Sequence, residues 1–146
     1  MYTNSFSYVA PNQQVHLRNL TSNSNSQLTY SLRQPGLPSD GGCIWPLWSP
    51  DHKWLAYFQS GSETVSPSVS IVEVGGMEQR ILAQENGALP IYACWAPDSS
   101  SLAVLYQMDE LFIYVYDIDK LGEGRLVAEG APLFFRWLPD SSALLL

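Results

Sequence analysis

A tryptophan-centred repeat constrains this chain more than any other feature. Trp48-Ser-Pro-Asp51, Trp95-Ala-Pro-Asp98 and Trp137-Leu-Pro-Asp140 follow one another after 47 and 42 residues. Each is preceded by two bulky apolar residues and followed by an apolar run such as Leu55-Ala-Tyr-Phe58. Proline presets φ for a turn, and aspartate can bond the backbone two residues further on. The pattern therefore predicts two antiparallel strands joined by a close turn in every unit.

The length of the repeat indicates the architecture. A period of about 40 to 50 residues with several strands per unit is typical of a β-propeller blade. The predicted strands are apolar on both faces, as expected where each blade packs between two others. The residue after aspartate would often be glycine, because a positive φ costs glycine little. Here it is His52, Ser99 or Ser141, so we expect the hairpin and leave its turn type open.

The repeat resembles that of TolB-type (WD-like) β-propellers. Tyr114-Val-Tyr-Asp-Ile-Asp119 and Arg125-Leu-Val127 fit the outer half of that repeat, and Ser70-Ile-Val-Glu-Val74 with Arg80-Ile-Leu82 fit it one unit earlier. The resemblance extends over residues 40–146 and more loosely over the N-terminal part. It implies an all-β fold with blades of four antiparallel strands, six of them in a complete ring. Such propellers serve many roles, so the resemblance implies a fold rather than a function.

Apolar stretches predict strands along the whole chain. In order these are Ser5–Ala10, Val15–Leu20, Gln27–Leu32, Cys43–Trp48, Trp54–Gln59, Ser68–Val74, Gln79–Ala83, Ile91–Trp95, Leu102–Gln107, Leu111–Ile118, Arg125–Ala128, Pro132–Trp137 and Ala143–Leu146. In phase with the tryptophans they divide into an outer half blade (1–42), two blades (43–90 and 91–130) and an inner half blade (131–146). About three blade-equivalents result, whereas a ring needs about 4 to 8.

Two interpretations of this incomplete count stay open. The terminal half blades are complementary, so two chains that exchange them head to tail would form one six-bladed ring as a homodimer. The apolar edge Ala143–Leu146 would then be paired with another chain instead of being bare. Alternatively, the chain is a piece of a longer propeller. The oligomeric state of the purified chain distinguishes the two.

Composition narrows the range of partners. The chain has 14 acidic and 7 basic residues and a net charge of −7, which argues against a nucleic-acid partner because such proteins present a basic face. No apolar run approaches the about 18 residues of a membrane span, and residues 1–14 lack the pattern of a signal peptide. We expect no membrane span and favour the cytoplasm, or the periplasm if the chain is part of a TolB-like protein.

Residues able to carry chemistry form no convincing set. The sequence has no Gly-x-Ser-x-Gly elbow and no phosphate-binding glycine loop. His16 and His52 have no recognisable relay partner, and His52 is expected in a turn. Cys43 and Cys94 are interpreted as buried small apolar residues, with their redox state left open. Asp117-Ile-Asp119 faintly resembles a calcium loop, but a turn between two strands explains it better.

Residues that recur in phase are interpreted as structural. These repeat residues are Trp48, Pro50, Asp51, Trp95, Pro97, Asp98, Trp137, Pro139 and Asp140. Their aspartates are three copies of one turn rather than a ring of catalytic carboxylates. The aromatic residues are mostly expected between blades. Trp45 and Tyr92 are the two that we expect at the mouth of a central channel.

Three functions fit such a propeller. The first is a non-catalytic binding module that presents loops and a central channel to a protein or peptide partner, with no cofactor and no metal. The second is the propeller of a prolyl-oligopeptidase-like serine peptidase, whose catalytic domain this sequence lacks. The third is a propeller hydrolase or lyase with a metal in the channel. We favour the first because it requires no catalytic residues.

Overall fold

The computed structural model describes residues 4–30, 42–61, 66–76, 78–84, 87–120 and 123–146. Every regular element in these ranges is a β-strand, and no helix able to span a membrane occurs in them. The strands are β1 (Ser5–Val9), β2 (Val15–Asn19), β3 (Asn25–Gln27), β4 (Cys43–Trp48), β5 (Trp54–Gln59), β6 (Ser68–Glu73), β7 (Gln79–Ala83), β8 (Leu89–Trp95), β9 (Ser101–Gln107), β10 (Leu111–Asp117), β11 (Gly124–Gly130), β12 (Arg136–Trp137) and β13 (Leu144–Leu145).

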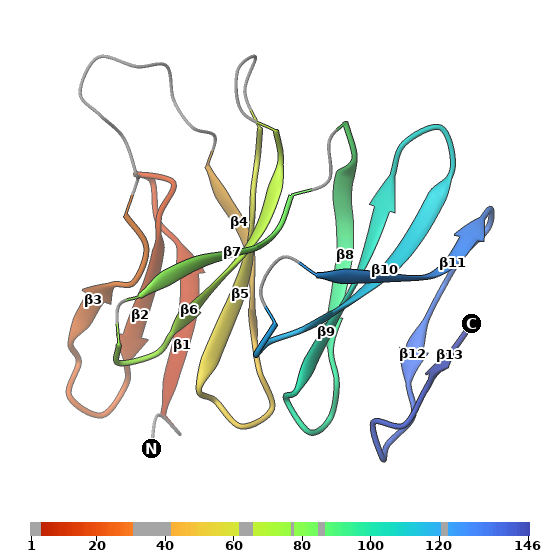
Figure 1. Cartoon of the computed structure of the whole chain (residues 1–146). Helices are drawn as coiled ribbons and strands as arrows, with labels where there is room; N and C mark the ends of the chain where they lie inside the picture. Colours follow the sequence, from red (N-terminus) through yellow and green to blue (C-terminus); the bar gives the residue numbers. More distant parts are fainter. Residues whose placement is uncertain (1–3, 31–41, 62–65, 77, 85–86, 121–122) are drawn as a thin grey trace.

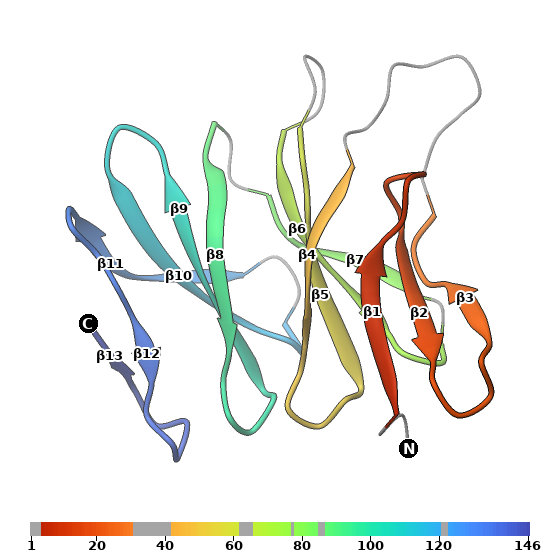
Figure 2. The same ribbon diagram turned by 180° about the vertical axis from the view of Figure 1, so that it is seen from behind.

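These strands form four antiparallel sheets that stand side by side in chain order (Figure 1). Two of them, β4-β5-β6-β7 and β8-β9-β10-β11, are the four-stranded blades that the repeat predicted, and we name them the first and second full blade. A three-stranded N-terminal sheet, β1-β2-β3, and a two-stranded C-terminal sheet, β12-β13, flank them. Seen from behind, β4, β8 and β12, the first strands of their sheets, follow one another from the middle to the left of the view (Figure 2). The all-β, blade-like architecture is confirmed.

The N-terminal sheet has three strands, as the sequence predicted, so it is more than the outer half blade assigned to residues 1–42. Its β1 runs in the direction of β5 and β9, the second strands of the full blades (Figure 1). The same backbone hydrogen bond identifies all three. It joins the residue after the third strand to the residue before the second: Leu20 N–H to Asn4 O, Val74 N–H to Lys53 O, and Ile118 N–H to Ser100 O. In the described residues this N-terminal blade therefore has its second, third and fourth strands.

The predicted strand Gln27–Leu32 is wrong in its bounds. Regular pairing ends at Gln27, because the Thr29 hydroxyl accepts the Val15 N–H at 2.9 Å and takes the place of a backbone carbonyl. Leu28 and Thr29 are buried, whereas Tyr30 is exposed, so Leu28 and Tyr30 do not share one face as their spacing predicted. Leu32 lies outside the described residues.

Each Trp-x-Pro-Asp motif forms the hairpin turn between the first two strands of its sheet. The residue after aspartate has a positive φ in every copy: 60° at His52, 67° at Ser99 and 62° at Ser141. Each aspartate carboxylate accepts the backbone N–H two residues further on, at 3.0 to 3.1 Å. The predicted turn is thus confirmed, with a left-handed residue that is not glycine.

Tryptophan links each sheet to the preceding one. The indole Nε1–H of Trp95 donates to the Leu47 carbonyl at 3.1 Å, and that of Trp137 donates to the Cys94 carbonyl at 3.0 Å. Each acceptor directly precedes the tryptophan of its own blade. The indoles therefore form a ladder of equivalent bonds from blade to blade.

Serine adds a second link at the turns. The Ser99 hydroxyl accepts the Asp51 N–H, and the Ser141 hydroxyl accepts the Asp98 N–H, both at 3.0 Å. A glycine at either position would avoid the strain of a positive φ but would lose this bond. The link between blades explains why serine occupies these two turns.

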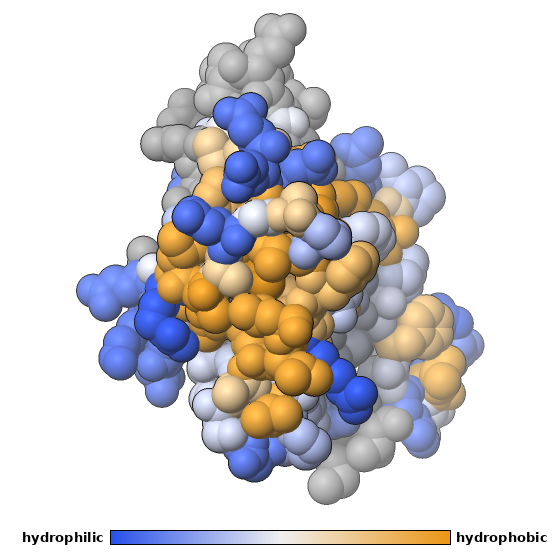
Figure 3. Space-filling model, turned by 90° about the vertical axis from the view of Figure 1, so that its right-hand side faces the viewer, coloured by the Kyte–Doolittle hydropathy of each residue, from blue (hydrophilic) through white to orange (hydrophobic). Residues whose placement is uncertain are grey.

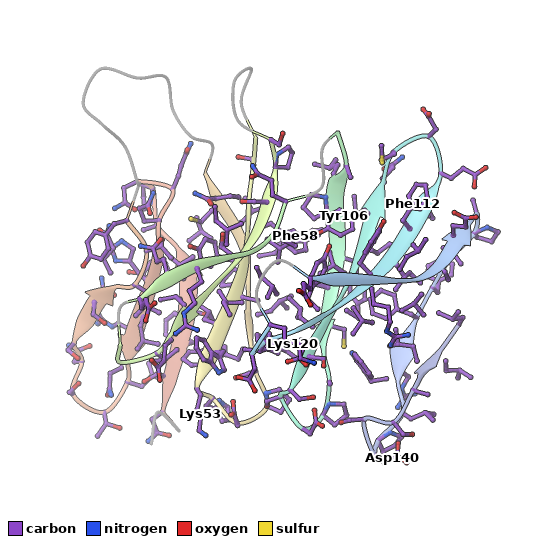
Figure 4. The ribbon with its side chains drawn as sticks, in the orientation of Figure 1. Lys53, Phe58, Tyr106, Phe112, Lys120 and Asp140 are labelled. Atoms are coloured by element: carbon purple, nitrogen blue, oxygen red, sulfur yellow. The ribbon has the colours of Figure 1, made fainter. Side chains whose placement is uncertain are left out.

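Apolar cores fill the spaces between neighbouring sheets. Alternate residues of β5 serve opposite cores: Leu55 and Tyr57 face the N-terminal sheet, and Ala56 and Phe58 face the second full blade. In Figure 4, Phe58 and Tyr106 lie in this second core, where Phe112 packs against them. The C-terminal sheet contributes Phe135 to a third core with β9 and β10. Blade-to-blade packing therefore provides the whole hydrophobic interior.

We predict that Trp95→Phe, which keeps a ring but removes the indole N–H, destabilises the chain. The Leu47 carbonyl loses its partner at a partly buried position, at a cost of about 1 to 2 kcal/mol in the free energy of unfolding. Urea denaturation followed by circular dichroism measures this loss. Trp45→Phe is the matched control, since the described contacts include no blade-to-blade bond of Trp45. Equal denaturation midpoints for the two variants would contradict the ladder.

Candidate functional site

The first strands β4 and β8 are both interrupted by a β-bulge. In β4 the pairing with β5 shifts between Ile44 and Leu47, and in β8 the pairing with β9 shifts between Pro90 and Tyr92. An extra residue in one strand bends it and redirects a side chain. Trp45, which the sequence analysis expected at a channel mouth, lies within the shift in β4, and Tyr92, the other such residue, directly follows the shift in β8.

Trp45 has a conformation that a bulky residue rarely adopts. Its φ of 51° lies in the left-handed region, which costs a non-glycine residue about 1 to 2 kcal/mol. Its indole is 59% exposed and contacts the Phe58 ring, with centroids 5.8 Å apart. Strain of this kind concentrates where a side chain serves binding or catalysis. An exposed tryptophan held by strain is the clearest indication of a functional surface in this chain.

Tyr92 and Phe134 occupy the equivalent positions in the next two units. Each stands three residues before its repeat tryptophan, as Trp45 does, and their exposed fractions are 47% and 81%. Tyr92 contacts the Phe135 ring at 5.3 Å, and a pocket of about 370 Å³ lies between Tyr92, Phe134, Phe135 and Leu105. We name Trp45, Tyr92 and Phe134 the aromatic stripe.

Phe134 was not among the predicted channel-mouth residues. The sequence does align Leu133-Phe134 with Ile44-Trp45 and Ile91-Tyr92, so the signal was present. Exposure could not be read from that alignment, because a phenylalanine between two apolar residues looks like a core residue. The structure instead buries Phe135 and exposes Phe134.

The other predicted residues are structural, and they do not converge. Trp95 and Trp137 belong to the indole ladder, and Trp48 packs against the core beside the N-terminal sheet. The repeat aspartates lie in the turns already described, and Figure 4 shows Asp140 at the last of these turns. The Asp117 carboxylate accepts the Asp119 N–H at 3.0 Å and pairs with Lys120 at 3.4 Å, as expected of a turn. Among the described residues, no group of three or more His, Cys, Asp or Glu side chains could hold a metal ion.

His16 and His52 lie in other parts of the chain than the aromatic stripe, whereas Cys43 and Cys94 each lie two residues from a stripe residue, Trp45 and Tyr92. His16 lies on β2 and contacts the Tyr8 ring at 5.7 Å, and His52 lies in a turn beside Trp48. Cys43 is buried and Cys94 partly buried, and both are free thiols. Burial raises the pKa of both thiols. Raised values disfavour the thiolate, which agrees with the interpretation of both cysteines as small packing residues.

Solved β-propeller structures share this arrangement of sheets. TolB from Acinetobacter baumannii superposes with a TM-score of 0.70 and 17% identity, over 98% of this chain and 35% of its own. A protein assigned to TolB from Agrobacterium tumefaciens gives 0.64 and 15%, over 86% and 46%. An oligogalacturonate lyase in complex with manganese gives 0.66 and 19%, over 90% and 34%.

The chain has the fold of a TolB-like β-propeller segment. It spans about a third to a half of the structures that it matches. No protein-family model and no curated protein matches it. Sequence identities this low show the fold alone, so the role of the chain rests on its own surfaces.

We predict that acid destabilises the chain through its turn aspartates. Hydrogen bonds from the Ser100 N–H and hydroxyl lower the pKa of Asp98, and those from the Ser142 hydroxyl and N–H lower the pKa of Asp140. At Asp51, partial burial raises the pKa, but bonds from neighbouring groups outweigh it and the net shift is downward.

Because the pKa of each aspartate is lower in the folded than in the unfolded chain, the ionised carboxylates stabilise the fold above the unfolded pKa of about 3.9. This stability is lost as the pH falls through the pKa values of the folded state. The urea midpoint should therefore be constant from about pH 7 to 5 and decrease below about pH 4. Replacing all three aspartates by asparagine should flatten this decrease, whereas Asp109→Asn, outside these turns, should preserve it. An unchanged acid profile in the triple variant would refute the prediction.

Proposed function

We propose that this chain is a non-catalytic β-propeller binding module that holds a protein or peptide partner on its aromatic stripe. The observation that carries the proposal is the strained, exposed Trp45, repeated in position by Tyr92 and Phe134. Large rigid aromatic side chains bury much area at little entropic cost, and tryptophan and tyrosine dominate binding hot spots. The first strands that carry them would line the central channel of a ring.

We also propose that two copies complete this ring. Each chain has three first strands in its described residues, β4, β8 and β12, so two copies supply the first strands of six blades. The described residues of the N-terminal sheet include no first strand, and β12 of a second copy would provide it. β13 competes with β1 for the edge of β12, but it is held by only two residue pairs, Arg136 with Leu145 and Trp137 with Leu144. We infer that β1 of the second copy displaces β13 from the edge of β12.

Such a ring would present six equivalent aromatic residues around one channel. A binding site with two-fold symmetry follows, because each copy contributes the same three residues. An extended peptide chain fits a narrow channel lined by aromatic faces better than a folded surface does. The proposed partner is accordingly a flexible terminus or loop of another protein.

A random peptide library displayed on phage tests the binding site. We expect panning against the immobilised chain to recover peptides whose affinity falls about tenfold or more in the Trp45→Ala/Tyr92→Ala/Phe134→Ala variant. The control variant Leu20→Ala/Tyr30→Ala removes exposed apolar groups elsewhere and should bind normally. The proposal fails if no peptide is recovered, or if the stripe variant binds as well as the wild-type chain.

Light scattering coupled to size exclusion tests the ring separately. The 146-residue chain should elute with twice its monomer mass of 16.3 kDa. A monomer at every concentration would refute the two-copy ring and leave the peptide-binding test unaffected.

A further inference from the structure

The outer side of the second full blade carries an apolar face that the C-terminal sheet covers only in part. Leu111, Val127 and Ala128 lie on this face around the buried Ile113 and Val115. Viewed from this side, a broad apolar area extends over the end of the assembly (Figure 3). We name it the end face. Soluble proteins rarely leave apolar surface of this extent without a partner.

A tryptophan of the first full blade has no counterpart on the end face. Trp54 begins β5, packs in the core between the full blades, and lies under the Arg80 guanidinium at 5.3 Å from its ring centroid. Strand register makes Ser101 the counterpart of Trp54 and Arg125 the counterpart of Arg80. The second full blade thus keeps the arginine but replaces the aromatic ring by serine.

A pocket occupies the place of the missing ring. It measures about 410 Å³ and is lined by Ser101, Val115 and Arg125 together with Asp117, Lys120 and Glu123. Figure 4 labels Lys120, one of the residues that line this pocket. The N-terminal sheet lacks both members of the pair, since Ser5 and Ser26 stand at these positions. Only the end face combines the arginine with an empty ring site.

We propose that the N-terminal sheet of a second copy covers the end face and inserts its Phe6 into this pocket beside Arg125. The proposal rests on the two-copy ring described above and assigns the surfaces that close it. In the single chain Leu144 of β13 holds the position that Phe6 would take, and β1 of the second copy displaces β13 in that ring. The occupant is a second copy of this chain because its N-terminal sheet carries the complementary change.

Phe6 has the position that corresponds to Leu102 in the interface between the full blades. Each follows the first residue of a second strand, and each is paired with a residue of the third strand, Arg18 or Tyr116. Leu102 is buried in the core that includes Trp54, whereas Phe6 is 46% exposed.

The interface between the full blades therefore combines Trp54 with Leu102. The proposed interface between two copies would combine Ser101 with Phe6. Such opposite changes in size keep the volume of a packed interface nearly constant. An aromatic ring beneath Arg125 would also restore the cation–π contact that Trp54 makes with Arg80. Tyr8 lies two residues beyond Phe6 on the same face of β1 and would extend the aromatic contact along the end face.

Directed disulfide formation tests the proximity. The double variant Phe6→Cys/Ser101→Cys should form a covalent dimer on mild oxidation, seen by non-reducing electrophoresis. Phe6→Cys and Ser101→Cys alone are the controls, because two-fold symmetry places identical positions of the two copies far apart. The native cysteines form a common background in all three. A dimer band no stronger in the double variant than in the single variants would overturn the proposal.

A size exchange tests the packing by light scattering. Ser101→Trp should fill the pocket with its own indole and raise the dissociation constant of the dimer about tenfold or more. Adding Phe6→Leu should recover much of the loss, because this pair reproduces the interface of Trp54 with Leu102. If Ser101→Trp does not fold, Phe6→Asp replaces it; Phe6 is exposed in the single chain, so a folded monomer is expected.

The two proposals fail differently. A wild-type monomer refutes the ring, and the end face then belongs to another protein or to further blades of a longer chain. A wild-type dimer that tolerates both Ser101→Trp and Phe6→Asp keeps the ring but refutes the assignment of its interface. Recovery by Phe6→Leu in the Ser101→Trp background is the result that supports both.

Discussion

The fold depends on sheets that are apolar on both faces. In β5, Leu55 and Tyr57 are buried on one side and Ala56 and Phe58 on the other, so no face is left for solvent. A sheet of this kind needs a neighbour on each side, and a sandwich of two layers would leave one face bare. Repetition of the sheets around an axis gives every sheet a neighbour on both faces. The indole and serine ladders then fix how far each blade is rotated from the last, since their bonds join equivalent positions at nearly equal lengths.

The sequence predicts best what is determined locally. A turn built from Pro50 and Asp51 is specified within a few residues, and its recurrence gave the strand order and the phase of both full blades. The sequence analysis left the left-handed conformation at Ser99 open. The hydrogen bond that favours serine there comes from the Asp51 N–H, 48 residues away, and cannot be read from the local sequence. The end of β3 is also set by a contact between residues distant in sequence. There the Thr29 hydroxyl, instead of a backbone carbonyl, accepts the Val15 N–H. The alternation of Leu28 and Tyr30 in the sequence does not indicate that the Thr29 side chain replaces a backbone carbonyl.

The aromatic stripe was predicted in part for a related reason. Trp45 and Tyr92 align with each other and with Phe134, but alignment gives the position of a residue and not its exposure. At Trp45 the exposure accompanies a bulge in β4, and at Tyr92 it accompanies the register shift just before it in β8. Bulges depend on how the first strand fits beside its neighbours, a tertiary property. A strained tryptophan at such a place is maintained by the surrounding sheet, so its exposure depends on the tertiary structure and not on the repeat alone.

The aromatic stripe and the end face are connected by the geometry of a ring. Residues of one first strand cannot enclose a channel, and the stripe of a single chain is an open arc whose last member, Phe134, is also its most exposed. Closing the ring would place the arc of a second copy opposite and convert three separate aromatic groups into a continuous lining. Occupation of the pocket beside Arg125 would therefore affect peptide binding at a distance, without any contact between the two sites. The coupling is reciprocal: a peptide that bridges both arcs must strengthen the association of the two copies by the same factor by which association strengthens its own binding.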